Sequence, residues 1–241
     1  MRALRLFLLA IATLYCSVMF DAVPANAADA ILFEGDSQTS PRAPVTAEQT
    51  YAALVSAQLG RPYVNYAVPG SKASDVIARL PGELSANPGA SCVMVMIGAN
   101  DAFIDPDTYM TQATASEWAA PLDPPASRTS VGDFEAQIVT IVSQIRAAGR
   151  NPVLLTPWAV WSTPNLVQFP WYVNRMKDVG ARLGVPVIDA YHIQPDLYWN
   201  IGNTGLAALE SDYQHPSAEG HARIAALILS ERYKLACVHH P

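Results

Sequence analysis

Short apolar runs alternate along the chain with longer segments in which apolar residues recur at helical spacing. The apolar runs have the length of buried strands, and they are Ile31–Glu34, Tyr63–Ala67, Cys92–Ile97, Pro152–Thr156 and Pro186–Asp189. Strands that alternate with helices are typical of a parallel sheet covered by helices on both faces. The pattern therefore predicts an α/β fold with a parallel sheet of about five strands.

The segments between these runs carry the start and stop signals of helices. A capping-box pattern over Thr46–Gln49 marks the first helix, and Gly60 ends it. The most regular helix is expected between Ser130 and Gly149, because its apolar residues recur every three or four positions. Further helices are expected over residues 74–80, where Pro81 follows, and over 171–183 and 218–235.

Two long stretches interrupt this rhythm. Residues 102–129 contain four prolines, and residues 190–211 show no clear periodicity. Each stretch follows a predicted strand, and open α/β sheets bind ligands beyond the carboxyl ends of their strands. Long loops at that edge are more often functional than accidental, so we expect a site there. No internal repeat or linker divides the chain, which predicts one domain.

The first residues have the features of a cleaved export signal. A basic start precedes an apolar run over residues 6–20, and Ala25-Asn26-Ala27 matches the small-x-small pattern of a cleavage site. The run is shorter than the roughly 20 residues of a spanning helix. We predict a signal peptide at 1–27, a mature domain at 28–241 and a secreted or periplasmic location. An uncleaved anchor or a buried N-terminal helix is the alternative.

Charge and composition exclude several classes of partner. The chain carries a net charge of −6 and has no cluster of lysines and arginines, so we expect no nucleic-acid partner. No second apolar run is long enough to span a bilayer, so we expect no stable membrane insertion after signal cleavage. No cysteine and histidine cluster has metal-binding spacing, so we expect neither a metal nor a nucleotide cofactor. The oligomeric state is not predicted.

The first predicted strand stops abruptly at Gly35-Asp36-Ser37, a triplet that suits either a turn or a nucleophile. A serine hydroxyl attacks an ester poorly unless a histidine accepts its proton and a third group orients that histidine. Asp212 and His215 are three residues apart, close enough in a tight turn for the carboxylate to hold the ring. His192, after the fifth predicted strand, is the alternative base. We rank it below His215, because we expect no carboxylate to orient it from the same short spacing.

Two other strand ends offer hydrogen-bond donors for a developing oxyanion. Gly70 lies in the loop after the second predicted strand, where a backbone N–H can point outward. Asn100 follows the third predicted strand and would bring a side-chain amide to the same edge of the sheet. Preorganised donors of this kind stabilise the charge that forms during acyl transfer. An Asx turn beside Asp101 is the alternative role for Asn100.

Four blocks in this order resemble the SGNH hydrolase superfamily, also called the GDSL esterases and lipases. The matching blocks are Gly35-Asp36-Ser37, Gly70, Gly98 with Asn100, and Asp212-Tyr213-Gln214-His215-Pro216. The resemblance implies a three-layer α/β/α sandwich of the flavodoxin-like kind. The chain departs from the family pattern at Gln38, where leucine is common, and at Ala67, where a second glycine is common. Position 38 is not a catalytic position in the family.

The same resemblance assigns a role to each block. It implies Ser37 as nucleophile, His215 as general base and Asp212 as the group that orients His215. It implies an oxyanion hole made of the N–H groups of Ser37 and Gly70 and the side chain of Asn100. No Gly-x-Ser-x-Gly elbow is required for this chemistry, and the chain contains none.

Aromatic residues near the predicted catalytic edge are candidates for contact with the substrate. Trp158 and Trp161 follow the fourth predicted strand and are our candidates for pocket walls, with Asp101 as a further substrate contact. Burial in the core under the long loops is the alternative for the tryptophans, and a structural partner is the alternative for Asp101.

A disulfide is expected at the opposite edge of the sheet. Cys92 begins a strand there, and the last predicted helix is about 28 Å long at ~1.5 Å per residue. That length brings Cys237 from the catalytic edge to the far edge. In an exported chain this placement predicts a Cys92–Cys237 disulfide.

These observations lead to the hypothesis of a secreted serine esterase that forms an acyl-enzyme on Ser37. Acetyl or short acyl esters, with esters of carbohydrates among them, fit an exported acidic protein with aromatic loops. A lipase, a lysophospholipase or a thioesterase would use the same residues, although the chain lacks a long apolar lid. An acyltransferase would differ only in excluding water. A non-catalytic carbohydrate-binding descendant of the fold is the alternative outside enzymes.

Overall fold

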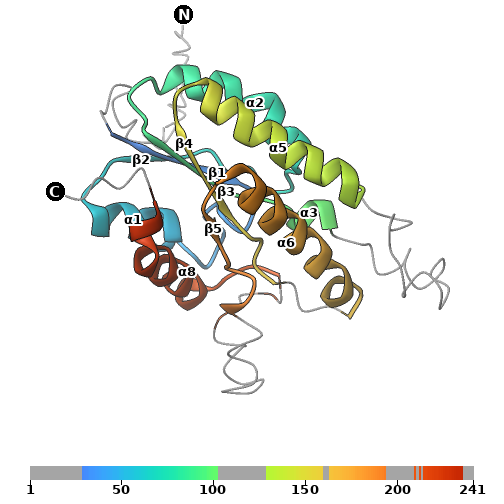
Figure 1. Ribbon diagram of the computed structural model, residues 1–241. Helices are drawn as coiled ribbons and strands as arrows, with labels where there is room; N and C mark the ends of the chain where they lie inside the picture. The colour runs from blue at the N-terminus through green and yellow to red at the C-terminus, as the bar shows by residue number, and fades with distance from the viewer. Residues whose placement is uncertain are drawn as a thin grey trace, which may run out of the picture.

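The computed structural model describes residues 29–102, 129–159, 163–193, 209, 212 and 214–235, with the backbone alone at 163–168. Their centre is a five-stranded parallel sheet in the order β2-β1-β3-β4-β5 (Figure 1). The strands are β1 Ile31–Gly35, β2 Tyr63–Asn65, β3 Cys92–Met96, β4 Asn151–Leu155 and β5 Val187–Ile188. The predicted parallel α/β sheet is therefore confirmed.

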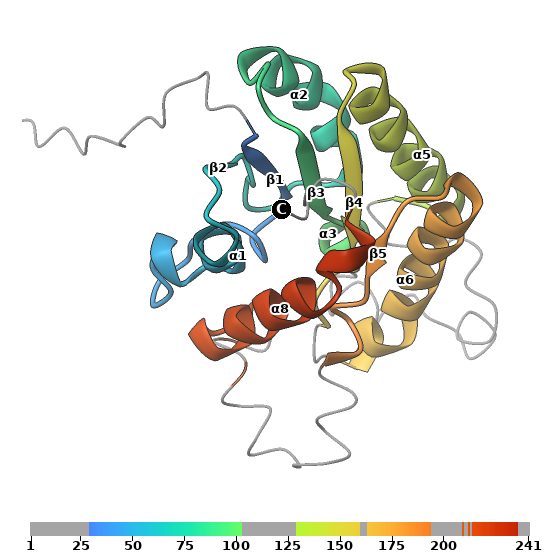
Figure 2. The same cartoon turned by 60° about the vertical axis from the view of Figure 1, so that its left-hand side comes forward.

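Helices cover the sheet on both faces. They are η1 Ala47–Gln49, α1 Tyr51–Leu59, α2 Ala73–Ala86, α3 Ala99–Ala102, α5 Val131–Ala147, α6 Thr163–Leu183, α8 Ala218–Ser230 and η2 Arg232–Lys234. Figure 2 shows α1 and α8 side by side on one face and α2, α5 and α6 on the other. The three layers of an α/β/α sandwich are thus present.

Alternation along the buried strands builds the two halves of the core. Because successive side chains point to opposite faces, Leu32 and Val93 pack under α2, α5 and α6. Phe33 and Met94 pack on the other side, under α1 and α8. All four side chains are fully buried, as expected for strands of a parallel sheet that is covered twice.

Helix α2 does not end where the sequence predicted. The expected stop before Pro81 was wrong, since the helix continues to Ala86 with Pro81 inside it. Proline lacks the N–H that would bond the carbonyl of Ile77 four residues earlier. The side chain of Gln144, on α5, donates to that carbonyl over 3.2 Å instead. A tertiary contact therefore satisfies the group that proline leaves open, and no local pattern announces it.

The strands end together at one edge of the sheet. Gly35 pairs with Met96, and Met96 pairs with Leu155. Beyond β2 the chain stays beside β1, because the N–H of Val68 donates to the carbonyl of Gly35 over 3.1 Å. The next strand in sequence, β2, pairs on one side of β1, and β3 pairs on its other side. The carboxyl end of β1 is therefore a topological switch point. The residues after Gly35 therefore enter the place where open α/β sheets bind ligands.

Two predictions about the ends of the chain stay predictions. The signal peptide at 1–27 lies outside the described residues, and so does Cys237. Cys92 is disulfide-bonded, but its partner lies outside the described residues, so the pairing with Cys237 is not tested. Within the described ranges, no helix combines the length and the apolar character that crossing a bilayer requires.

Candidate active site

Ser37 lies in a tight turn directly after β1. The backbone N–H groups of Thr39 and Ser40 both donate to the carbonyl of Asp36 over 3.1 Å. The N–H of Gln38 donates to the Asp36 carboxylate over 2.9 Å. These bonds fold the chain around Ser37 and leave its side chain half-buried at the edge of the sheet. Asp36 therefore stabilises the turn that presents the serine.

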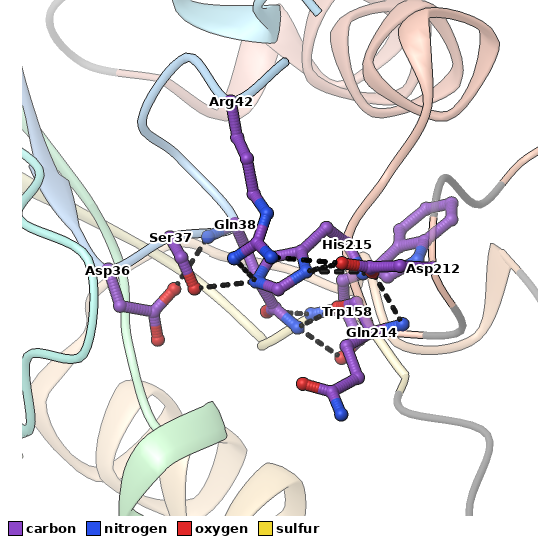
Figure 3. A network of polar contacts seen from close by, with 8 residues as sticks. All are labelled: Asp36, Ser37, Gln38, Arg42, Trp158, Asp212, Gln214 and His215. Atoms are coloured by element: carbon purple, nitrogen blue, oxygen red, sulfur yellow. Dashed lines mark hydrogen bonds and ion pairs between the residues drawn. The ribbon is translucent and has the colours of Figure 1, made fainter. Parts of the chain in front are cut away.

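A continuous chain of hydrogen bonds runs from Ser37 through His215 to Asp212 (Figure 3). The Oγ of Ser37 lies 2.8 Å from Nε2 of His215. The Nδ1 of His215 lies 2.8 Å and 2.9 Å from the two carboxylate oxygens of Asp212. A neutral ring that donates from Nδ1 keeps Nε2 as an acceptor, so the ring is oriented to accept the serine proton.

Asp212 also organises the segment that carries the histidine. Its Oδ1 accepts from the backbone N–H groups of Gln214 and His215 over 3.2 Å and 3.0 Å. Burial alone would raise the pKa of Asp212, but the hydrogen bonds and charge of His215 outweigh it and hold that pKa below its ordinary value. The three-residue spacing thus corresponds to a turn in which the ionised carboxylate of Asp212 accepts hydrogen bonds from the backbone and from the ring of His215.

A second histidine has the same local arrangement, contrary to our expectation. Asp189 precedes His192 by three residues, and its Oδ2 lies 2.7 Å from Nδ1 of that ring. The reason for ranking His192 below His215 was therefore wrong. The feature that distinguishes His215 from His192 is the contact of its Nε2 with the hydroxyl of Ser37. Asp189 also accepts from Thr156 and forms an ion pair with Lys177, which points to a structural role for this pair.

The two predicted oxyanion donors beyond Ser37 lie in segments that are bonded to its turn. The amide nitrogen of Asn100 lies 3.0 Å from the Ser71 carbonyl and 3.3 Å from Oδ2 of Asp36. It therefore connects the residue after Gly70 with the residue before Ser37. Gly70 is exposed in a turn with φ 81°, a backbone conformation that favours glycine.

Arg79 fastens the Gly70 turn to the end of β1. Its guanidinium donates to the Ser71 hydroxyl over 2.9 Å and to the Gly35 carbonyl over 3.0 Å. It is held in turn by the buried carboxylate of Glu34, 2.7 Å away. One cation thus fixes the segments on both sides of the predicted oxyanion hole, a role that we did not predict from the sequence.

Asp101 has a different position from the one we predicted for a substrate contact. Its side chain is 0% exposed and accepts from the hydroxyl of Thr129 over 2.7 Å. It also accepts from the N–H of Ala73, the first residue of α2, over 3.1 Å. These bonds make it a helix cap and a loop anchor, so the structure supports the structural alternative. Burial raises the pKa of Asp101 to about 6.

The tryptophans are also placed differently from a pocket rim. Trp158 is 0% exposed and belongs to the core cluster under α1 and α8. Its ring leaves little room at Gly220, where an added Cβ would lie 3.4 Å from it. Complete burial contradicts the prediction of a pocket wall and supports the core alternative. Trp161 lies outside the described residues.

Besides Arg79, two further residues at the site were not identified from the sequence as functional. Arg42 is half exposed, and its guanidinium lies 3.3 Å from Oδ2 of Asp212 and 3.4 Å from Nε2 of His215. Gln38 is buried between the turn of Ser37 and the segment of His215. Only their closeness to Ser37 in the chain could have drawn attention to them.

Asp36 predicts a specific dependence of stability on pH. Burial raises the pKa of its carboxyl from 3.8 to about 7. The folded chain then keeps a proton that the unfolded chain releases, so stability falls as pH rises from about 4 through 7, by an amount on the order of 4 kcal/mol. Asp36→Asn lacks this titration. Its melting temperature should rise relative to that of the parent between pH 5 and 8, as measured by circular dichroism.

The absolute stability of Asp36→Asn does not enter this test, because losing one acceptor has a cost that is independent of pH. A constant difference in melting temperature across the range would show that Asp36 has an ordinary pKa.

The comparisons with known proteins agree with this geometry. A model of the GDSL-like lipase/acylhydrolase family matches residues 33–223. Comparison with curated proteins gives no match. Among solved structures, LAE5, an alpha/beta hydrolase enzyme from the metagenome of Lake Arreo, is 20% identical with a TM-score of 0.65, over 89% of this chain and 98% of its own.

A second solved structure is a catalytic mutant of Axe2, an acetylxylan esterase from Geobacillus stearothermophilus. It is 18% identical with a TM-score of 0.64, over 90% of this chain and 99% of its own. At such identities these structures establish a shared fold. The family match, in contrast, covers the segments of Ser37, Gly70, Asn100 and His215.

Proposed function

The chain belongs to the GDSL-like lipase/acylhydrolase family and is a serine-type carboxylic ester hydrolase, and from this premise we propose that it is an exported enzyme that removes acetyl or other short acyl groups from carbohydrates. The observation that carries the reaction is the hydrogen-bonded chain Ser37–His215–Asp212, with distances of 2.8 Å at both of its links.

In the proposed reaction, the Oγ of Ser37 attacks the ester carbonyl while Nε2 of His215 accepts the hydroxyl proton. Asp212 holds the ring and stabilises the imidazolium that forms. The C–O bond to the alcohol then breaks, and the alcohol leaves with the proton from His215. Water, deprotonated by His215, attacks the acyl-enzyme and releases the carboxylic acid and free Ser37.

The oxyanion that forms in each half of the reaction needs donors already in place. We assign the backbone N–H groups of Ser37 and Gly70 and the side-chain amide of Asn100. The longer bond of that amide, 3.3 Å to Asp36, is the one that an oxyanion would replace. Asn100 then keeps its 3.0 Å bond to the Ser71 carbonyl, which preserves the orientation of the amide.

Three observations support a short acyl group on a polar alcohol. The predicted signal peptide and the acidic mature chain fit work outside the cell on soluble or polymeric material. One structural neighbour with the same fold is an acetylxylan esterase. The exposed guanidinium of Arg42 beside His215 and Asp212 gives the catalytic edge a polar surface. A site for long acyl chains would instead present an apolar one.

The test begins with an organophosphorus reagent that reacts only with activated serines. Treatment of the purified mature chain with a fluorophosphonate should add one adduct by intact mass, and Ser37→Ala should add none. Ser40→Ala is the matched control, because this serine lies in the same turn and its buried hydroxyl has no hydrogen-bond partner among the described residues. A folded parent without an adduct would overturn the serine mechanism.

The substrate class is tested by rates on esters that differ in one group at a time. On nitrophenyl esters, kcat/KM should be highest for acetate and fall with each lengthening of the acyl chain. Acetylated xylo-oligosaccharides should release acetate at comparable or higher rates. A preference for chains of eight or more carbons would instead identify a lipase or a lysophospholipase of the same family.

A further inference from the structure

The side chain of Gln38 joins three separate loops at the catalytic edge (Figure 3). Its Nε2 donates to the carbonyls of Trp158 and Gln214, both over 3.1 Å. Its Oε1 accepts from the N–H of Trp158 over 2.9 Å. Both N–H groups and the carbonyl oxygen of the amide are therefore used. The side chain of Gln38 is 1% exposed and its two bonds to Trp158 are buried, whereas its bond to the exposed residue Gln214 is partly buried.

Gln38 connects the two segments whose side chains meet at the contact between Ser37 and His215. Gln38 directly follows Ser37, and Gln214 directly precedes His215. Trp158, in the loop after β4, is fully buried and gives the amide a rigid support on the sheet. A single side chain therefore fixes the backbone beside the nucleophile to the backbone beside the base, across 176 residues of sequence.

Local bonds around His215 do not replace this connection. Asp212 bonds to the ring and to the backbone of its own segment, so it orients the ring within the segment. The guanidinium of Arg42 also reaches this segment, but its side chain is half exposed and screened by solvent. Among the described residues, the amide of Gln38 connects this segment to the loop after β4.

We propose that Gln38 is a positioning residue for ester hydrolysis, which holds the segment of His215 where Nε2 meets the hydroxyl of Ser37. This inference rests on the proposed function of Ser37 and His215. Leucine would fill a similar volume but would remove the bonds that Gln38 makes to the N–H of Trp158 and to the carbonyls of Trp158 and Gln214. The segment would shift to satisfy them, and a shift near 1 Å at a reacting group costs about 100-fold in rate.

The first test compares Gln38→Leu with the parent on nitrophenyl acetate. We expect kcat to fall about 100-fold with KM changed less than threefold, because the substrate contacts stay and the proton transfer is misaligned. The rate of fluorophosphonate labelling should fall by a similar factor. Gln144→Leu is the matched control, since it removes one amide bond to the carbonyl of Ile77, between α2 and α5. That variant should keep the kcat of the parent.

A second variant keeps the inference testable where Gln38→Leu does not fold. Gln38→Glu retains an acceptor for the N–H of Trp158 but replaces the donor nitrogen by oxygen. When protonated, the new carboxyl can still donate to one of the two carbonyls; when ionised, it repels both. Its kcat relative to the parent should therefore fall as pH rises from 5 to 8, a trend that a purely structural role would not produce.

The outcomes separate this inference from the proposed function. A parent that takes no fluorophosphonate adduct overturns the function itself. A labelled parent, with a folded Gln38→Leu variant that reacts at the same rate, overturns only the role of Gln38. A Gln38→Glu profile that superimposes on the parent's profile from pH 5 to 8 overturns it as well.

Discussion

Replacement of His215 by glutamine is expected to lower kcat by about 10⁴-fold or more, a loss comparable to that caused by Ser37→Ala. Glutamine has a similar length and polarity, but its amide cannot accept a proton at neutral pH. Ser37 would then attack the ester as an ordinary alcohol. The change is measured by the kcat for nitrophenyl acetate, and circular dichroism should show that the variant remains folded.

The chain contains a matched control for this experiment. His192 has a carboxylate three residues before it and a 2.7 Å bond to that carboxylate, as His215 does, but no serine faces it in the described contacts. His192→Gln should therefore keep the kcat of the parent within about twofold. If His192→Gln lost activity while His215→Gln kept it, the assignment of the base would be reversed.

Gly35→Ala should produce the largest loss of stability and should also inactivate the enzyme. A Cβ at this position would lie 2.4 Å from the backbone carbonyl of Met96 and 2.4 Å from the hydroxyl of Thr39. Cβ atoms in protein structures essentially never lie so close to another heavy atom, and the carbonyl of Met96 belongs to the backbone of β3, which cannot easily move away. We expect destabilisation on the order of 3 kcal/mol, hence a melting temperature lower by about 10 °C. Thermal unfolding measures this, and kcat at 10 °C reports the displaced turn of Ser37.

Gly82→Ala is the matched control, because it adds the same methyl group to open space. Gly82 lies within α2, and an added Cβ there meets no atom within 4 Å. Alanine should stabilise this helix by about 0.5–1 kcal/mol, since glycine is the poorer helix former. Equal effects of the two substitutions would mean that the turn after β1 is not closely packed.

The sequence predicted what depends on local patterns and on the ends of strands. Buried strands are nearly continuous apolar runs, so their approximate positions followed from Ile31–Glu34 and similar segments. Parallel strands end at a common edge, and therefore the turn of Ser37 and the block of Asn100 were expected to meet. The three-residue spacing of Asp212 and His215 was enough to suggest the bond that the structure shows.

What the sequence did not predict depends on contacts between distant segments. Pro81 looked like a helix end because the bond from Gln144 to Ile77 lies far away in sequence. Trp158 and Asp101 looked exposed because they follow strands, but α8 covers the first and α2 requires the second as a cap. Gln38 was set aside because its neighbours in sequence do not reveal its bonds to Trp158 and Gln214.

The distance in sequence between Ser37 and His215 has a consequence for when the chain becomes active. The two residues that share a proton are 178 positions apart, and every strand of the sheet is synthesised before His215. Chains are made from the N-terminus, so the strands of the described sheet are synthesised before the base is. Ser37 therefore has no partner in His215 until the segment that leads into α8 has been added to the chain. We therefore expect hydrolysis to begin only after the segment of His215 has been synthesised and has packed beside the turn of Ser37.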